Sequence, residues 1–387
     1  VLGRAGAWCG QNKYLSAIKN AFQNFMPLTI AGAIGVLWCN VLVNDQTGLG
    51  LFFKPIMALD FLNPAFQAVN FCTISCITVG ITLGIAQEIG VWNMGAEKAG
   101  YIPGLVGLAA WLSVTNTSHM VEGAKEAFTG IAGNELGATG LFTGMIIGVL
   151  SVELFCFFEK QDALKIKMPE QVPPGVARAF EVLVPATITL IITACIGSAC
   201  YNLTGLYLND VIKNGIQGPL GAVGATIPGV MIIYLVIMLF WLVGIHGNNM
   251  LSAVKEALFT PLALENVEKF NKGEKPTNII NMYALQMWGE FGGSGVTIGL
   301  VIAIMIFGKR EDNKAIASLS LVPGLFNINE TVTFGIPMVL NPILGIPFVF
   351  ACLVTILVGY VLTVIGFCPV ACLTVPWTTP PIVFGFL

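Results

Sequence analysis

The sequence contains few charged residues and almost no histidine. Aspartate, glutamate, lysine and arginine make up 10% of its 387 residues, and the whole sequence contains only two histidines. Soluble domains normally carry about a quarter charged residues, so this composition excludes an ordinary soluble protein. Two histidines exclude a histidine-rich metal site, and a net charge of −3 provides no basic surface for nucleic acid.

The sequence also lacks paired cysteines and a nucleotide-binding loop. Its ten cysteines are scattered through apolar segments, and none forms a CxxC pair. We therefore interpret them as small hydrophobic residues rather than redox or metal groups. A GxxxxGK[ST] loop is missing as well, so ATP is not the direct energy source. We expect no cofactor and no bound metal.

Long apolar segments dominate what is present. Hydrophobic residues make up 56% of the chain and the mean hydropathy is +0.82. A bilayer needs about 20 apolar residues per helix, so the sequence predicts an all-α polytopic membrane protein. The predicted spans are about 26–43, 65–87, 99–116, 138–158, 182–205, 229–245, 296–308 and 343–367. Because the sequence begins at valine and ends in PPIVFGFL, we expect both ends to be trimmed, with a further helix missing.

Basic residues predict the orientation of these spans. The segments 159–181 and 309–314 are rich in lysine and arginine, and such loops stay in the cytoplasm. Counting back through four spans places the N-terminus in the cytoplasm too, as the early basic residues Arg4, Lys13 and Lys19 also indicate. Residues 117–137 form an outer loop in which His119 is expected to be solvated. Residues 11–26 and 206–216 have one apolar face each, which predicts helices lying along the membrane.

The second half of the chain reads as a series of interrupted apolar stretches. Short segments broken by glycine and proline at about 246–264 and 315–342 predict two re-entrant hairpins, with a polar linker at 265–278 after the first. Such segments are the best sequence indication of a transporter's substrate site. We therefore predict an N-terminal membrane domain at 1–205 and a substrate-binding domain at 206–387.

Each predicted hairpin carries one ionisable residue in a polar cluster. His246 begins the run HGNN, and Glu330 lies in NINETVTFG. A charged residue at membrane depth costs roughly 2.5 to 3.5 kcal/mol, so it indicates function by default. A carboxylate and an imidazole that converge on one hydroxyl would accept its proton and fix its oxygen. The alternatives are a capped helix end at His246 and a structural acid at Glu330.

Other polar residues in the second half are candidates for substrate binding. Glu290 precedes a glycine-rich run in which backbone can approach a ligand closely, although the same run also suits helix packing. Trp377 offers an aromatic face to a sugar, while tryptophan at the membrane interface is equally common. The full set of candidates is Asn248, Asn249, Glu290, Gly293, Ser294, Asn327, Asn329, Trp377 and Thr378.

Four segments carry a resemblance to a known family. Together they resemble the membrane-embedded IIC component of the bacterial phosphoenolpyruvate-dependent sugar phosphotransferase system, in its lactose, cellobiose and diacetylchitobiose branch. The resemblance covers the whole chain, although Thr331 stands where the family usually has proline. The segments are HGNN at 246–249, GGSG at 292–295, NINETVTFGIPMVLNPILGIPF at 327–348 and PWTTPP at 376–381.

This resemblance implies more than the residues show by themselves. It implies about ten transmembrane helices, a homodimer in the bacterial inner membrane with 1–205 at the dimer interface, and an elevator-like movement of the second half. It implies a cytoplasmic IIB partner, separate from this chain, that carries a phosphocysteine. By position, Glu330 would deprotonate the 6-hydroxyl of a disaccharide, and His246 would position it.

Two other functions remain open from the residues alone. One is an ion-coupled secondary sugar transporter in which Glu330 is a proton site and no phosphorylation occurs. The other is a sugar-binding membrane receptor that transports nothing. The sequence does not specify which disaccharide is bound.

Overall fold

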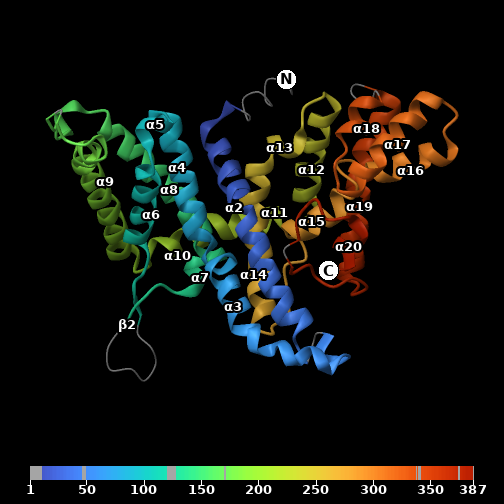
Figure 1. Ribbon diagram of the computed structural model, residues 1–387, viewed down its shortest axis with the longest axis horizontal. Helices are drawn as coiled ribbons and strands as arrows, with labels where there is room; N and C mark the ends of the chain where they lie inside the picture. The colour runs from blue at the N-terminus through green and yellow to red at the C-terminus, as the bar shows by residue number, and fades with distance from the viewer. Residues whose placement is uncertain are drawn as a thin grey trace. The chain divides into compact units, whose positions relative to one another are not determined.

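The computed structural model describes residues 11–45, 49–119, 128–169, 171–336, 338, 341–373 and 375–386. In these ranges the chain is mostly helical and forms two compact units (Figure 1). Unit 1 includes Ile30–Asn70 and the chain from Leu220, and unit 2 includes Asn12–Thr29 and Phe71–Pro219. Five helical stretches among the described residues are long and apolar enough to cross a membrane, which confirms a helical polytopic membrane protein. They are Lys13–Asn40, Lys54–Met94, Thr139–Glu159, Pro174–Thr204 and Ile343–Val364.

Unit 2 is built around long helices that lie side by side, α4, α6, α8 and α9 (Figure 1). One short antiparallel ladder pairs β1 with β2. The helix α2 starts in unit 2 and continues into unit 1. The elements are α2 (Lys13–Leu37), η4 (Ile74–Cys76), α4 (Ile77–Met94), α5 (Ala96–Ala99), α6 (Ile102–Val114), β1 (Ser118–His119), β2 (Phe128–Thr129), α7 (Gly133–Leu136), α8 (Ala138–Glu159), η5 (Asp162–Leu164), α9 (Pro174–Thr204), α10 (Leu208–Ile212) and η6 (Lys213–Gln217).

Small residues let the helices of unit 2 approach closely. The isoleucines of α4 recur every four residues, from Ile77 to Ile89, and are at most 2% exposed. A Cβ atom added at Gly107 of α6 would lie 2.3 Å from Cβ of Ala86 in α4, and one at Gly144 of α8 would lie 2.2 Å from the Thr82 hydroxyl. Any larger side chain at these glycines would separate the helices.

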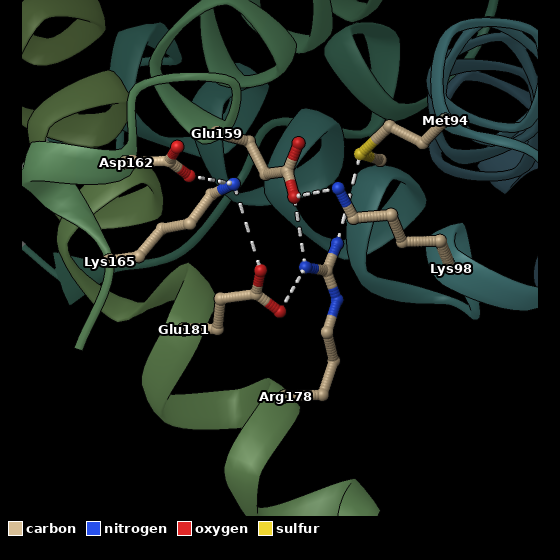
Figure 2. A network of polar contacts seen from close by, with 7 residues as sticks. All are labelled: Met94, Lys98, Glu159, Asp162, Lys165, Arg178 and Glu181. Carbon is tan, nitrogen blue, oxygen red and sulfur yellow. Dashed lines mark hydrogen bonds and ion pairs between the residues drawn. The ribbon is translucent and has the colours of Figure 1, made fainter. Parts of the chain in front are cut away.

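A network of charged side chains joins α5, α8 and α9 at one end of unit 2 (Figure 2). Glu159 is 1% exposed and pairs with Lys98 at 2.8 Å and Arg178 at 2.9 Å. Arg178 also binds Glu181 at 2.7 Å. Two cations compensate the buried carboxylate, as burial of a charge requires. At the exposed edge, the Lys165 ammonium bonds to Asp162 and lowers the pKa of its carboxyl below the usual value.

Unit 1 contains the segments that carry the candidate site. The helix α12 packs on α19, α14 on α15, and α17 on both α16 and α18. The elements are η1 (Trp38–Leu42, a π-helix), η2 (Leu49–Leu51), η3 (Lys54–Leu62), α3 (Asn63–Cys72), α11 (Gly218–Gly224), α12 (Ile227–Leu242), α13 (Gly247–Met250), α14 (Ser252–Asn271), α15 (Met282–Gly289), α16 (Thr297–Phe307), α17 (Glu311–Leu325), α18 (Glu330–Gly335), α19 (Pro342–Val364) and α20 (Pro381–Phe386).

Two predicted boundaries are wrong. The helix predicted along the membrane at 11–26 is the first half of the longer helix α2, which continues through Pro27, because an interior proline kinks a helix without having to end it. The polar linker predicted at 265–278 is helical up to Asn271, since α14 runs on from Ser252. The charges that suggested a linker instead form i,i+4 ion pairs at this end of α14, which stabilise a helix. These pairs are Glu265–Lys269 at 2.9 Å and Glu268–Lys272 at 2.6 Å.

The two compact units are not the two predicted domains. Unit 1 includes Ile30–Asn70, and unit 2 extends past 205 to Pro219. The functional division into 1–205 and 206–387 stays a prediction, because compact packing does not show which part moves. Parts of these predictions lie outside the described residues, namely Arg4, residues 120–127 of the predicted outer loop, and residues 337, 339 and 340 of the second predicted hairpin.

Candidate functional site

The candidate site consists of two arms, the HGNN segment at 246–249 and the NINE segment at 327–330. The first arm begins where α12 ends. The Gly244 amide donates to the Trp241 carbonyl at 2.9 Å, and the Ile245 amide donates to the Phe240 carbonyl at 3.0 Å. With Gly244 at a φ of 79°, this is the Schellman termination that glycine favours. The chain then turns, and His246 caps the short helix α13.

The hydrogen bonds of His246 define which ring nitrogen carries the proton. Its Nδ1 accepts from the backbone amide of Asn249 at 3.3 Å, so Nδ1 is unprotonated in this arrangement. In the neutral ring the proton is then on Nε2, which lies 3.4 Å from Oε1 of Glu330. The ring packs against the buried indole of Trp241, with centroids 4.3 Å apart. His246 therefore presents an N–H toward Glu330.

The second arm begins where α17 ends, and α17 ends with the same hydrogen-bonding motif as α12. The Asn327 amide donates to the Gly324 carbonyl at 3.1 Å, and the Ile328 amide donates to the Pro323 carbonyl at 3.0 Å. Asn327 has a φ of 63°, the left-handed conformation that asparagine tolerates better than most residues. Glu330 then begins α18. Glu330 therefore lies directly after a break between α17 and α18.

Thr331 follows Glu330 in the first turn of α18. Proline is also accommodated in a first turn, because its missing amide proton has no partner there. Threonine in place of proline therefore requires no different backbone.

The glycine-rich loop, GGSG at 292–295, connects the two arms. The Asn248 side-chain amide donates to the Ser294 hydroxyl at 2.8 Å, and that of Asn329 donates to the Ser294 carbonyl at 2.7 Å. Gly293 has a φ of 94°, and a Cβ atom there would lie 2.5 Å from Cβ of Asn329. The second arm therefore packs directly on the backbone of this loop.

Asn327 attaches two further segments to the second arm. Its Oδ1 accepts from the Gly292 amide at 2.9 Å, and its Nδ2 donates to the Trp377 carbonyl and, at 2.9 Å, to the Thr379 carbonyl. Trp377 is 41% exposed, and the half-buried Thr378 lies in the same turn. The structure thus places the HGNN, GGSG, NINE and PWTT segments next to one another, as a shared site requires.

The side chains of these segments differ in how many of their polar atoms remain available for a substrate. Both polar atoms of the Asn327 amide and the amide nitrogen of Asn329 already bind backbone. Asn248 keeps its Oδ1 buried without a hydrogen-bond partner within the described residues. Asn249 is exposed and supplies its backbone amide to His246. A direct contact of each with substrate stays a prediction.

Glu290 has protein partners that the sequence did not suggest. Its Oε1 pairs with the Lys255 ammonium and lies 3.4 Å from the Tyr234 hydroxyl, which donates to it. Lys255 is only 4% exposed. The available signal was that Lys255 and Glu290 are two opposite charges in apolar surroundings, and burial requires that such charges find a partner.

The geometry suits recognition of a hydroxyl group. A hydroxyl placed between His246 and Glu330 would accept a hydrogen bond from Nε2 and donate its proton toward the carboxylate. Both side chains remain partly accessible, at 35% and 45%. Within the described ranges no three His, Cys, Asp or Glu side chains gather as a metal site would require.

Comparison with known proteins finds similar sequences along nearly the whole chain. A sequence model of the family described as Phosphotransferase system, EIIC matches residues 19–352. The oligo-beta-mannoside-specific EIIC component of Bacillus subtilis is 33% identical over 97% of this chain and 83% of its own length. The cellobiose-specific EIIC component of Lactococcus lactis is 29% identical over 98% of this chain and 88% of its own length.

A solved structure shows the same fold. It is the crystal structure of the transporter ChbC, the IIC component from the N,N'-diacetylchitobiose-specific phosphotransferase system. The similarity has a TM-score of 0.89 at 29% identity, and covers 98% of this chain and 88% of that chain.

Proposed function

Because this chain belongs to the EIIC family of the phosphotransferase system, we propose that it imports a disaccharide and presents its 6-hydroxyl for phosphorylation. The single observation that supports the chemistry best is the pairing of His246 with Glu330, at 3.4 Å, from two helix ends that share one termination motif. The similar proteins named above act on cellobiose, oligo-beta-mannosides and diacetylchitobiose. We infer a substrate of this class for this chain.

The proposed chemistry is transfer of a phosphoryl group from a phosphocysteine of a cytoplasmic IIB partner. Glu330 accepts the proton of the 6-hydroxyl while the new bond forms between that oxygen and phosphorus. The bond between sulfur and phosphorus breaks, and the cysteine thiolate stays on the partner. His246 donates from Nε2 to the sugar oxygen and fixes its direction. Phosphoryl transfer depends chiefly on such alignment and on electrostatic stabilisation.

The buried surroundings of the pair support a binding role. The Trp241 Nε1 and Asn248 Oδ1 atoms are buried and have no hydrogen-bond partner in the part of the chain that the structure describes. Because both atoms are closed off from solvent, a sugar hydroxyl would bind them only after neighbouring side chains move, and such a bond would satisfy polar atoms that are costly to leave unpaired. The exposed indole face of Trp377 is a surface on which a sugar ring can stack.

Transport in this proposal is an elevator-like movement of the second half of the chain. The functional protein is a homodimer in the bacterial inner membrane with the N-terminus in the cytoplasm. Basic residues between 159 and 181 and between 309 and 314 support this orientation. Phosphorylation traps the sugar inside, so no ion gradient is needed.

Reconstituted vesicles test this proposal. Vesicles loaded with phosphorylated IIB should convert external cellobiose to internal sugar phosphate without any ion gradient, and the Glu330→Gln variant is the matched control. Uptake that a protonophore abolishes, without formation of sugar phosphate, would instead support an ion-coupled transporter. Saturable binding without accumulation would indicate a receptor.

A further inference from the structure

Lys255 is a buried cation for which the chemistry of His246 and Glu330 has no role. It lies in the first turn of α14 and is 4% exposed. Its ammonium pairs with Glu290 and lies 5.4 Å from the centre of the Tyr234 ring. A lysine at this depth is retained only with a close counter-charge. The pair joins α14 to Glu290, which lies two residues before the glycine-rich loop at 292–295.

This ion pair lies close to the candidate site. The Glu290 carbonyl accepts from the Gly293 amide at 2.9 Å, and the neighbouring Ser294 hydroxyl accepts from Asn248, two residues after His246. Glu256 follows Lys255 in sequence, feels the charges of both Lys255 and Glu290, and accepts a hydrogen bond from Thr260. The described carboxylates nearest this part of the site are therefore those of Glu330 and Glu290, and the cation paired with Glu290 is the Lys255 ammonium.

We propose that Lys255 is a positioning residue that cancels the charge of Glu290 beside His246, so that an anionic phosphoryl donor can approach the sugar. This inference rests on the proposed function. A phosphocysteine carries negative charge, and like charges in a poorly screened site repel strongly. A disaccharide carries no net charge, so its binding depends much less on whether Lys255 cancels the charge of Glu290.

The same pair protects the hydrogen bonds of His246. If Glu290 lost its cation, the free carboxylate would favour the doubly protonated imidazolium. Nδ1 would then carry a proton and could no longer accept from the Asn249 amide. The imidazole would lose the bond that aims Nε2 at Glu330. Lys255 thus acts on the reaction through two neighbours, without touching substrate.

Four variants test the proposal in purified full-length protein in vesicles. Lys255→Met removes the cation, and Lys255→Arg keeps it. Glu290→Gln removes the carboxylate charge, and the double variant Lys255→Met/Glu290→Gln removes both charges. The two measurements are cellobiose binding and single-turnover phosphorylation by phosphorylated IIB at saturating cellobiose.

If Lys255 balances the charge of Glu290, the variants should show a specific pattern of phosphorylation rates and cellobiose affinities. Lys255→Met should slow phosphorylation at least tenfold and raise the concentration of phosphorylated IIB needed for half-maximal rate, with cellobiose affinity within threefold of the unmodified protein. Lys255→Arg should restore the rate. The double variant should match the Glu290→Gln single variant within threefold, because neither has an uncompensated carboxylate at position 290.

Other patterns would overturn the proposal. A double variant that is tenfold slower than Glu290→Gln would show that the lysine is needed for itself, and this comparison stands even where Lys255→Met alone fails to fold. Equal losses of cellobiose binding and phosphorylation in Lys255→Met would show a structural role only. No phosphoryl transfer by the unmodified protein would contradict the proposed function itself, which is a different outcome from slowing in the variants.

Discussion

Replacement of Glu330 by glutamine separates substrate binding from chemistry. Glutamine keeps the size of the side chain and one acceptor oxygen, but it cannot take up a proton. The carboxylate is 45% exposed, and its nearest described partner is Nε2 of His246, 3.4 Å away. A polar contact this long and this exposed contributes at most about 1 kcal/mol, so the variant should fold normally.

The expected losses follow from the two roles of the carboxylate. Removal of a general base costs about 10²–10⁴-fold in rate. Exchange of a charged acceptor for a neutral one at a sugar hydroxyl costs roughly 1 to 1.5 kcal/mol, which is about tenfold in affinity. We therefore expect phosphorylation to fall at least about a hundredfold while cellobiose affinity stays within about tenfold.

Two assays on the same preparation measure these losses. Isothermal titration with cellobiose gives the affinity, and rapid-quench transfer from phosphorylated IIB gives the rate. Glu330→Asp is a matched control that keeps the charge but shortens the side chain. Phosphorylation by Glu330→Gln at a near-normal rate would show that the acid is structural and would refute the assignment.

Three other substitutions test the second side chain of the site, the packing of the glycine-rich loop, and the charged network of unit 2. His246→Ala should lower both cellobiose affinity and the phosphorylation rate, because a positioning contact acts in the ground state and the transition state alike; unchanged turnover would count against its role. Gly293→Ala should lower the melting temperature and destabilise the protein by about 2 kcal/mol or more, because its positive φ is strained for alanine and the new Cβ would clash with Asn329. The control Gly299→Ala should be neutral or slightly stabilising, because a Cβ there meets no atom within 4 Å. Arg178→Ala should destabilise the protein by roughly 1 to 3 kcal/mol in a thermal unfolding assay, since the buried Glu159 loses one of two cations; an unchanged melting temperature would show that the network contributes little.

Hydrophobic length was sufficient to predict much of the fold. The span predicted at 138–158 is α8, which ends at Glu159. The segment predicted at 296–308 is the apolar helix α16, Thr297–Phe307, which is shorter than the helices long enough to cross a membrane. Apolar length decides such helices locally, so sequence alone can find them. The extent of α14 was not predictable in this way, because its polar end is stabilised by ion pairs that only a helix brings together.

The candidate site was predictable in its chemistry but not in its connections. The helix breaks before His246 and Glu330 follow from Gly244 and from the NIN run, which sequence shows directly. The pairing of Lys255 with Glu290 depends on a tertiary contact between α14 and the end of α15, and no spacing in the sequence encodes it. The bonds of Asn327 to the 377–379 turn are of the same kind.

The most direct test of the central claim uses the sugar rather than the protein. Cellobiose that lacks the 6-hydroxyl of its non-reducing ring should bind to the unmodified protein within about tenfold of cellobiose, because a single neutral hydrogen bond is worth about 1 kcal/mol. It should not be phosphorylated, and its affinity should be the same for the Glu330→Gln variant, since the group that Glu330 binds is missing. Phosphorylation of this analogue, or an NMR spectrum of the cellobiose product that places phosphate on another hydroxyl, would contradict the account.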